Sequence, residues 1–168
     1  MRLIESNVEI LPQPNLMIGV YRQIERAGRT CYKSEDKITD DSAKEFVDRM
    51  IKNGHTAMLE HGTVYLYVEE TDKSTKEEVE ECYEVYDFYR TNKYSKAVGI
   101  GTGTLTGHRN QYYITTNYRV IVENNRYQDF QKYICAPMAN HPKRFSVRFT
   151  CDRGVSHELV RHKKLCVA

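Results

Sequence analysis

Residues 144–162 constrain the fold of this chain more than any other stretch. Phe145, Val147 and Phe149 alternate with polar residues, and this period of two predicts a strand with one buried face. Asp152 then occupies a position typical of a helix N-cap, and apolar residues recur about one turn apart behind it. The pattern therefore predicts a core strand that passes directly into a helix.

Polar side chains crowd the remaining positions of this predicted helix. His157 and Glu158 begin a His-Glu-x-x-His pattern, but a zinc protease needs its second histidine four residues on, where this chain has Arg161. His162 comes one position too late for that face, so we infer no metal site. We expect Arg161, His162 and Lys163 to form a cationic cluster that holds an anion or stabilises negative charge on a ring. A solvated helix face with a salt-bridged histidine is the alternative.

Length and composition favour one ordinary globular domain. The chain has 168 residues, a formal net charge of +2 and 40% apolar residues, which argues against a polyelectrolyte or a disordered tail. No apolar run is long enough for a membrane helix, and the first residues do not resemble a signal peptide. The five cysteines are scattered without a Cys-x-x-Cys pair, so we expect reduced thiols and a cytoplasmic protein.

Periodicity along the rest of the chain predicts alternating helices and strands. The expected strands cover residues 1–12, 63–68, 112–122 (with a bend near Asn117) and 145–150, and the expected helices cover 15–28, 41–52, 75–91 and 127–135. The glycine-rich stretch 99–107 lacks both a Walker loop and a dinucleotide fingerprint, so we expect a flexible hairpin or loop there. We predict an α+β fold with a mainly antiparallel sheet flanked by helices, in a single domain spanning 1–168.

A second polar motif lies between the predicted helix 41–52 and the strand that follows it. The segment Gly54-His-Thr-Ala-Met-Leu-Glu-His61 places two histidines and Glu60 in a short connection, where functional side chains are often held by a rigid scaffold. The alternative is that Glu60 and His61 only bond the backbone at the turn. No third ligand is close in sequence, so this motif also predicts no metal.

Together these motifs resemble the flavin-dependent thymidylate synthases. That family has a Gly-His-x-x-x-x-Glu-His segment before a strand, an Arg-His-Arg signature on a late helix, and an upstream Ala-Arg-x-Ser-like segment similar to Gly28-Arg-Thr-Cys31. The resemblance covers about residues 20–68 and 144–163. Residues 69–144 look like an insertion relative to the shortest members of the family.

The late signature departs from the family pattern at two positions. Lys163 replaces the last residue of Arg-His-Arg, and Cys166 occupies the position of the first signature serine. The remaining signature positions would follow residue 168, so we expect a C-terminally truncated or degenerate member.

The resemblance implies an enzyme that methylates dUMP to dTMP. It implies FAD as hydride carrier, NADPH as the reductant of the flavin, and methylenetetrahydrofolate as the carbon donor. By resemblance the catalytic residues are Arg161, His162 and His55, the cofactor-binding residues are Cys31, His55, Glu60 and Lys163, and the substrate-binding residues are Glu158 and Arg161. A homotetramer with sites shared between subunits is also implied.

Two other functions stay open on the sequence. One is a non-catalytic flavin- or nucleotide-binding remnant of the same fold. The other is an RNA- or single-stranded-DNA-binding module that uses Tyr112, Tyr113, Tyr118 and Arg119 as a stacking and charged surface. The near-neutral net charge and the tendency of tyrosine to pack in cores argue against it, so we expect neither a nucleic-acid nor a membrane partner.

Overall fold

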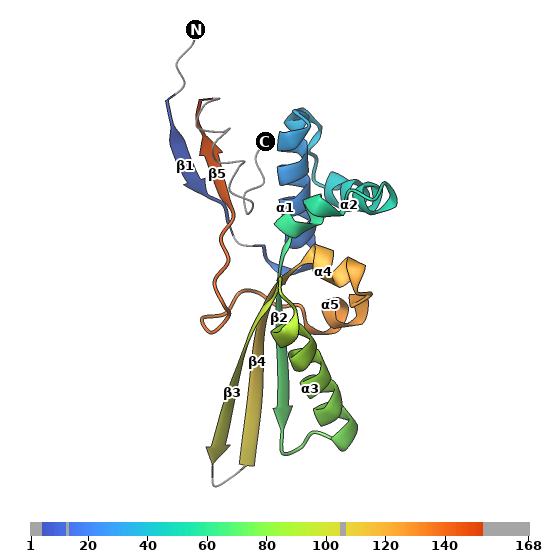
Figure 1. Ribbon diagram of the computed structural model, residues 1–168, viewed down its shortest axis with the longest axis vertical. Coiled ribbons are helices and arrows are strands. Elements are labelled where there is room, and N and C mark those ends of the chain that lie inside the picture. The colour runs from blue at the N-terminus through green and yellow to red at the C-terminus, as the bar shows by residue number, and fades with distance from the viewer. Residues whose placement is uncertain (1–4, 13, 105–106, 153–168) are drawn as a thin grey trace.

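The structure is a computed structural model that describes residues 5–12, 14–104 and 107–152. In chain order its elements are β1 (Asn7–Ile10), α1 (Leu16–Cys31), the 3-10 helix η1 (Glu35–Lys37), α2 (Ser42–Lys52), the 3-10 helix η2 (Thr56–His61), β2 (Thr63–Thr71), α3 (Lys76–Thr91), β3 (Lys96–Thr104), β4 (Gly107–Asn117), α4 (Tyr118–Glu123), α5 (Tyr127–Tyr133) and β5 (Val147–Thr150). Figure 1 shows an elongated molecule, with α1 and α2 at one end and the tip of the β3–β4 hairpin at the other. The α+β architecture with antiparallel sheets is as predicted.

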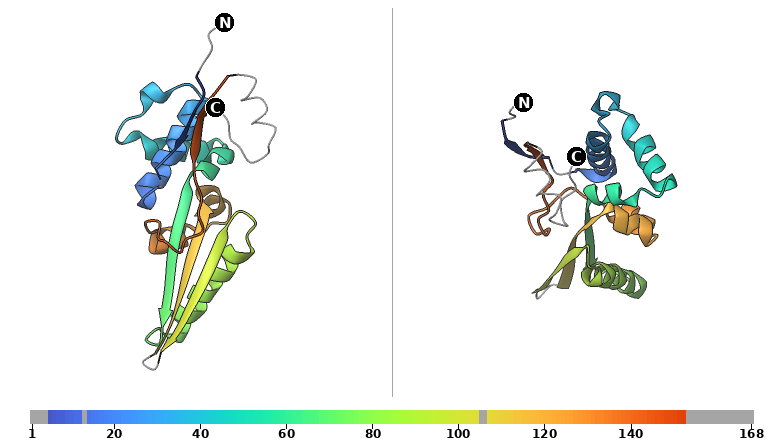
Figure 2. Two further views of the ribbon diagram at one scale, coloured as in Figure 1. Left: turned by 90° about the vertical axis from the view of Figure 1, so that its left-hand side faces the viewer. Right: turned by 45° about the horizontal axis from the view of Figure 1, so that its top comes forward.

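A three-stranded antiparallel sheet in the order β2-β4-β3 forms the long part of the molecule. Helix α3 lies along one face of this sheet, as two views show (Figures 1 and 2). Its first turn closes as a capping box, because Thr75 Oγ1 accepts the Glu78 N–H at 3.2 Å and the Glu78 carboxylate accepts the Thr75 N–H at 2.8 Å. The predicted helix at 75–91 is confirmed.

The hydrophobic core lies where the sheet meets the helices. Strand residues Leu66 and Ile114 and helix residues Ile24, Val47 and Ile121 are at most 1% exposed. They come from β2, β4, α1, α2 and α4, so the core connects both ends of the molecule. Burial of these side chains supplies the main stabilisation of the arrangement. The predicted helices 15–28 and 41–52 and strand 63–68 are confirmed, with α1 and β2 each continuing three residues further.

The predicted strand at 112–122 is wrong over its second half. Strand β4 ends at Asn117, whose side-chain oxygen accepts the Val120 N–H at 3.1 Å and so caps helix α4. This local cap outweighs the strand preference of the β-branched residues that follow. The glycine-rich stretch forms a hairpin, as predicted, although most of it belongs to strand β3.

A separate two-stranded ribbon joins the two ends of the described chain. Strands β1 and β5 pair antiparallel, with Val8 opposite Phe149 and Ile10 opposite Val147. The strand at 145–150 is thus confirmed over 147–150, but the prediction of a buried apolar face is wrong, because Ile10 is 66% and Phe149 43% exposed. Glu9 lies on the opposite face of the ribbon, where it pairs with Arg26 of α1 at 3.9 Å and with Arg148 at 2.5 Å. Because this polar face is the one that contacts α1, the apolar face points away from it.

The helix predicted to follow Asp152 lies outside the described residues. Within the described ranges, no helix has the length and apolar character that crossing a membrane requires.

Candidate functional site

Helices α1 and α2 end in the same kind of turn. After α2 the His55 N–H donates to Met50 O at 2.9 Å and the Gly54 N–H to Ile51 O at 3.0 Å. This is a Schellman motif, which needs a left-handed residue after the helix, and Gly54 has φ +70°. The turn fixes the backbone of His55 directly behind α2.

The end of α1 repeats this geometry with a residue that has a side chain. The Ser34 N–H donates to Arg29 O at 2.9 Å and the Lys33 N–H to Thr30 O at 3.2 Å, and Lys33 has φ +48°. The turn places Tyr32 at the C-cap of α1, directly after Cys31. Both predicted motif segments are therefore anchored by helix ends.

The two helix ends meet through Tyr32 and His55. The Tyr32 hydroxyl lies 3.3 Å from Nδ1 of His55, and both residues are exposed. Burial raises the pKa of the neighbouring Cys31 thiol, so Cys31 is protonated at neutral pH and offers an S–H group. The structure thus brings together the segments that contain the predicted residues Cys31 and His55. It also places Tyr32, which the sequence motifs did not include, at this candidate site.

Glu60 is held by residues from distant parts of the chain. Its carboxylate accepts from Arg119 Nη1 at 2.6 Å, and its backbone oxygen accepts from Arg144 Nη2 at 3.0 Å. Arg119 also donates to Glu123 at 2.7 Å, and Glu123 in turn accepts from Thr56 Oγ1 at 3.1 Å. The alternative in which the Glu60 side chain only bonds the backbone is wrong.

His61 has an unusual environment beside this network. Its Nε2 is buried and, across residues 5–12, 14–104 and 107–152, makes no hydrogen bond; the same holds for Thr63 Oγ1. Burial lowers the pKa of His61, and the positive charge of Arg144 lowers it further, against the opposing effect of Glu60. His61 is therefore neutral at pH 7.

The predicted site residues fall into three groups. Cys31 and His55 lie at the joined ends of α1 and α2. Glu60 lies five residues after His55, about 10 Å further along η2 at a rise of about 2 Å per residue. The predicted residues Glu158, Arg161, His162 and Lys163 lie outside the described residues, and their roles stay predictions.

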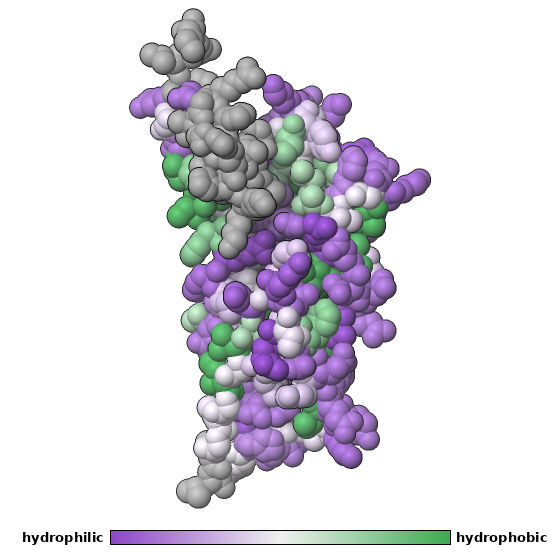
Figure 3. Space-filling model, viewed as in Figure 1, coloured by the Kyte–Doolittle hydropathy of each residue, from purple (hydrophilic) through white to green (hydrophobic). Residues whose placement is uncertain are grey.

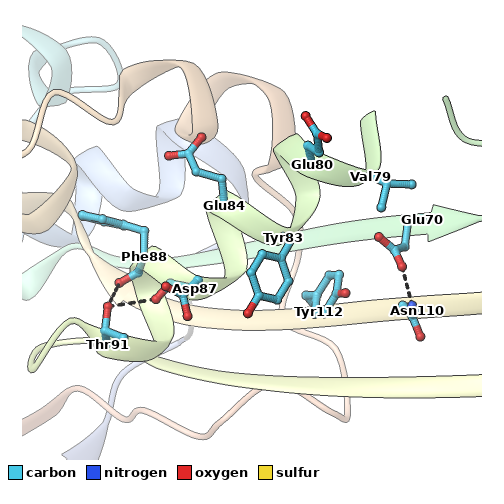
Figure 4. A pocket seen from close by; sticks show the side chains of 10 residues that line it. All are labelled: Glu70, Val79, Glu80, Tyr83, Glu84, Asp87, Phe88, Thr91, Asn110 and Tyr112. Carbon is cyan, nitrogen blue, oxygen red and sulfur yellow. Dashed lines mark hydrogen bonds between the residues drawn. The ribbon is translucent and has the colours of Figure 1, made fainter. Parts of the chain in front are cut away.

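A groove runs along helix α3, away from these residues (Figure 4). Its volume is about 850 Å³, and Tyr83 and Tyr112 line it together with the acidic residues Glu70, Glu80, Glu84 and Asp87. Four carboxylates repel phosphate groups, so this groove is unsuited to a nucleotide. In the described ranges, this groove included, no three histidine, cysteine or carboxylate groups gather as a metal site requires.

The residues proposed for nucleic-acid stacking do not form one surface. The Tyr112 ring stacks on Tyr86 of α3 at 4.5 Å, whereas Tyr113 is adjacent on β4 and packs against His141 on the opposite face. Tyr118 is 4% exposed and lies in the core, and Arg119 is paired with carboxylates. Core packing of Tyr113 and Tyr118 is confirmed.

Comparison with known proteins identifies one segment of the chain. No curated protein and no solved structure matches the chain. A family model described as "Thymidylate synthase complementing protein" matches residues 17–82, which include Cys31, Tyr32, His55 and Glu60. The match indicates a thymidylate synthase-related function, and it extends 14 residues past position 68, into the stretch expected to be an insertion. Over residues 17–82 the chain is therefore similar to this family.

Proposed function

We propose that the protein is an FAD-dependent thymidylate synthase, which converts dUMP to dTMP with methylenetetrahydrofolate as carbon donor and NADPH as reductant. The observation that carries the proposal is the family match, which includes both the Gly28–Cys31 and the Gly54–His61 segments. The contact between Tyr32 and His55 supports it, because it joins the ends of these two segments.

The side chains at the joined helix ends suit a flavin. Isoalloxazine is planar and carries carbonyl groups and ring nitrogens, so it needs flat surface and hydrogen-bond donors. Tyr32 is 53% exposed and presents an aromatic face, and His55 is an exposed imidazole beside it. Cys31 directly precedes Tyr32 in the chain and by resemblance contacts the flavin. These residues would hold the flavin, with Glu60 and Lys163 as further contacts by resemblance.

The chain's own residues would supply orientation and charge. A bound flavin supplies the hydride, and NADPH restores the reduced flavin. Arg161 and His162 would lie against the flavin and the pyrimidine, with Glu158 at the nucleotide. A fixed cation near a uracil carbonyl stabilises the negative charge that develops there during methylation, so the protein needs no nucleophile of its own.

Self-association is part of the proposal. Val8, Ile10, Val147 and Phe149 form one exposed apolar face of the β1–β5 ribbon, and Figure 3 shows apolar surface at the edge where Figure 1 places these strands. A two-stranded ribbon is marginally stable alone in water, and soluble monomers rarely expose such a face. We propose that a second copy covers it in a homo-oligomer, which by resemblance is a tetramer.

The visible spectrum of the purified protein tests the cofactor. We expect flavin absorption bands, and dTMP formation when dUMP, methylenetetrahydrofolate and NADPH are supplied together. A protein that binds FAD but forms no dTMP is instead the non-catalytic remnant. A protein that stays colourless after addition of FAD contradicts both functions.

A further inference from the structure

We propose that Tyr32 is a positioning residue, whose phenolic O–H donates a hydrogen bond to Nδ1 of His55 and so keeps the His55 proton on Nε2. The Nε2–H group then serves as a donor to a carbonyl oxygen of the bound ring. The second step rests on the proposed function, in which His55 faces a planar heterocycle. Tyr32 stands one residue beyond the Gly28–Cys31 motif and belongs to neither motif that the resemblance uses.

The geometry comes from two anchored backbones. The Tyr32 N–H donates to Gly28 O at 3.0 Å, and the His55 N–H donates to Met50 O at 2.9 Å. Each side chain therefore starts from a helix end that its own turn holds in place. The distance of 3.3 Å between the hydroxyl and Nδ1 is long for a hydrogen bond, as is common for site residues before a ligand binds.

The chemistry of the two groups decides the direction of the bond. A neutral imidazole has one N–H donor and one bare nitrogen that accepts, whereas a phenol can do both. The phenolic O–H is a stronger donor than a neutral imidazole N–H, and a bare ring nitrogen is a stronger acceptor than a phenolic oxygen. The pairing Tyr32 O–H to Nδ1 is therefore favoured, and the hydrogen bond at one nitrogen sets the protonation of the other.

The second nitrogen of His55 is available to a ligand. Within the part of the chain that the structure describes, Nε2 makes no hydrogen bond, and the residue is exposed. A neutral N–H donor fits a carbonyl oxygen, which both the isoalloxazine ring and uracil carry beside an N–H group. The shared chemistry is thus an imide edge, from FAD or from dUMP.

The tautomer can be measured without any ligand. The full chain is labelled with ¹⁵N-histidine and studied by long-range ¹H–¹⁵N NMR at about pH 8, where ordinary histidines are neutral. Loss of one signal in His55→Gln assigns that residue, and unchanged signals of the buried His141 and the exposed His108 show that each variant is folded. We expect the Nε2–H form in the wild type and a mixture of both forms in Tyr32→Phe. Tyr94→Phe, which alters another exposed tyrosine, leaves the signal unchanged.

Two outcomes of this measurement overturn the proposal. One is a His55 signal with the proton on Nδ1, which means that Tyr32 accepts. The other is an Nε2–H signal that Tyr32→Phe does not change, which means that the contact does not set the tautomer.

Separate titrations with FAD and with dUMP identify the ligand. Tyr32→Phe should weaken the binding of the ligand that meets Nε2 in proportion to the share of His55 that loses the Nε2–H form, about twofold for an equal mixture, and leave the other unchanged. Unchanged binding of both ligands contradicts the positioning role. If the wild type binds neither ligand, the proposed function fails, and the NMR result alone decides the Tyr32–His55 pair.

Discussion

The ring of Phe46 lies directly over Gly28 and fixes how closely helices α1 and α2 pack. A Cβ on Gly28 would come 2.5 Å from Cζ and 2.7 Å from Cε1 of Phe46. The ring cannot move aside easily, because it is 3% exposed and has the guanidinium groups of Arg29 and Arg49 over it at 5.1 and 5.4 Å. This contact holds together the two helices whose ends carry Tyr32 and His55.

Gly28→Ala should therefore destabilise the protein. Alanine would favour the helix by about 1 kcal/mol, but overpacking costs about 1–3 kcal/mol, and a nearly immobile ring places this site at the upper end. We expect a net loss of about 1–2 kcal/mol in urea unfolding. Gly103→Ala is the control, because its Cβ would meet no atom within 4 Å. A Gly28→Ala protein as stable as the wild type would contradict the close packing.

Breaking the buried ion pair between Glu25 and Arg29 should destabilise the protein more than Gly28→Ala does. Arg29 Nε donates to Glu25 Oε1 at 3.0 Å, and the Glu25 side chain is 1% exposed. Arg29→Ala leaves that carboxylate buried with Ser42 as its remaining partner, so we expect a loss of about 3–5 kcal/mol. The double variant Glu25→Leu, Arg29→Met should lose less than Arg29→Ala.

An exposed ion pair on helix α2 serves as the control. Lys44 and Asp48 form an i,i+4 pair at 2.8 Å in which both side chains are mostly exposed. Lys44→Ala should leave the unfolding midpoint unchanged within error. Equal effects of Arg29→Ala and Lys44→Ala would contradict the structural role of the buried pair.

Substitutions at the left-handed positions of the two helix ends should change the stability of the protein in opposite directions. Lys33 occupies a left-handed conformation that costs a residue with a side chain about 1 kcal/mol, so Lys33→Gly should stabilise the protein by about that amount. Gly54 occupies the same conformation and meets no crowding, so Gly54→Ala should destabilise by about 1 kcal/mol through strain alone. Thermal or urea unfolding of both variants checks this, and effects of the same sign would contradict the assignment of the turns.

His141 makes stability depend on pH. Its Nδ1 accepts the Met138 N–H at 2.9 Å, and its Nε2 lies 3.0 Å from Leu66 O, to which it donates. Burial lowers the pKa of His141 and outweighs the hydrogen bond to Leu66 O, which acts to raise it, and nearby Lys143 lowers the pKa further. As pH falls below about 6.5, the unfolded chain therefore takes up a proton that the folded protein resists, and the free energy of unfolding decreases.

Urea unfolding between about pH 7.5 and pH 5 measures this dependence. His141→Gln should flatten the slope, and His61 contributes in the same direction because burial lowers its pKa as well. His108→Gln, at an exposed position on β4, should keep the wild-type slope. A protein that becomes more stable as pH falls through this range would contradict the neutral, buried state of His141.

Local patterns predicted the elements, and long-range contacts account for what they missed. The apolar stripes of α1 and α2 and the Thr75 cap are encoded within one or two turns, so periodicity was sufficient for them. The side-chain cap at Asn117 is also local, but the β-branched residues after it favoured a longer strand. Alternation with a period of two shows that a strand has an apolar and a polar face. It does not show which of these faces packs against the rest of the protein, so the exposure of Phe149 was not predictable.

The site was predictable only in part for the same reason. His55 and Glu60 stand out in the sequence because they crowd a short connection before a strand. Arg119 binds Glu60 from 59 residues away, and Tyr32 meets His55 from 23 residues away. Neither pair can be recognised from the spacing of residues in the sequence, because each contact depends on how distant segments pack together.

Equilibrium titration of the purified chain with FAD tests the central claim most directly. The account predicts that the wild type and the control His108→Ala bind FAD with the same affinity, and that His55→Ala binds it at least tenfold more weakly, on the order of 1.4 kcal/mol. Failure of the wild type to bind FAD, or equal binding by His55→Ala, would contradict a flavin site at the joined ends of α1 and α2.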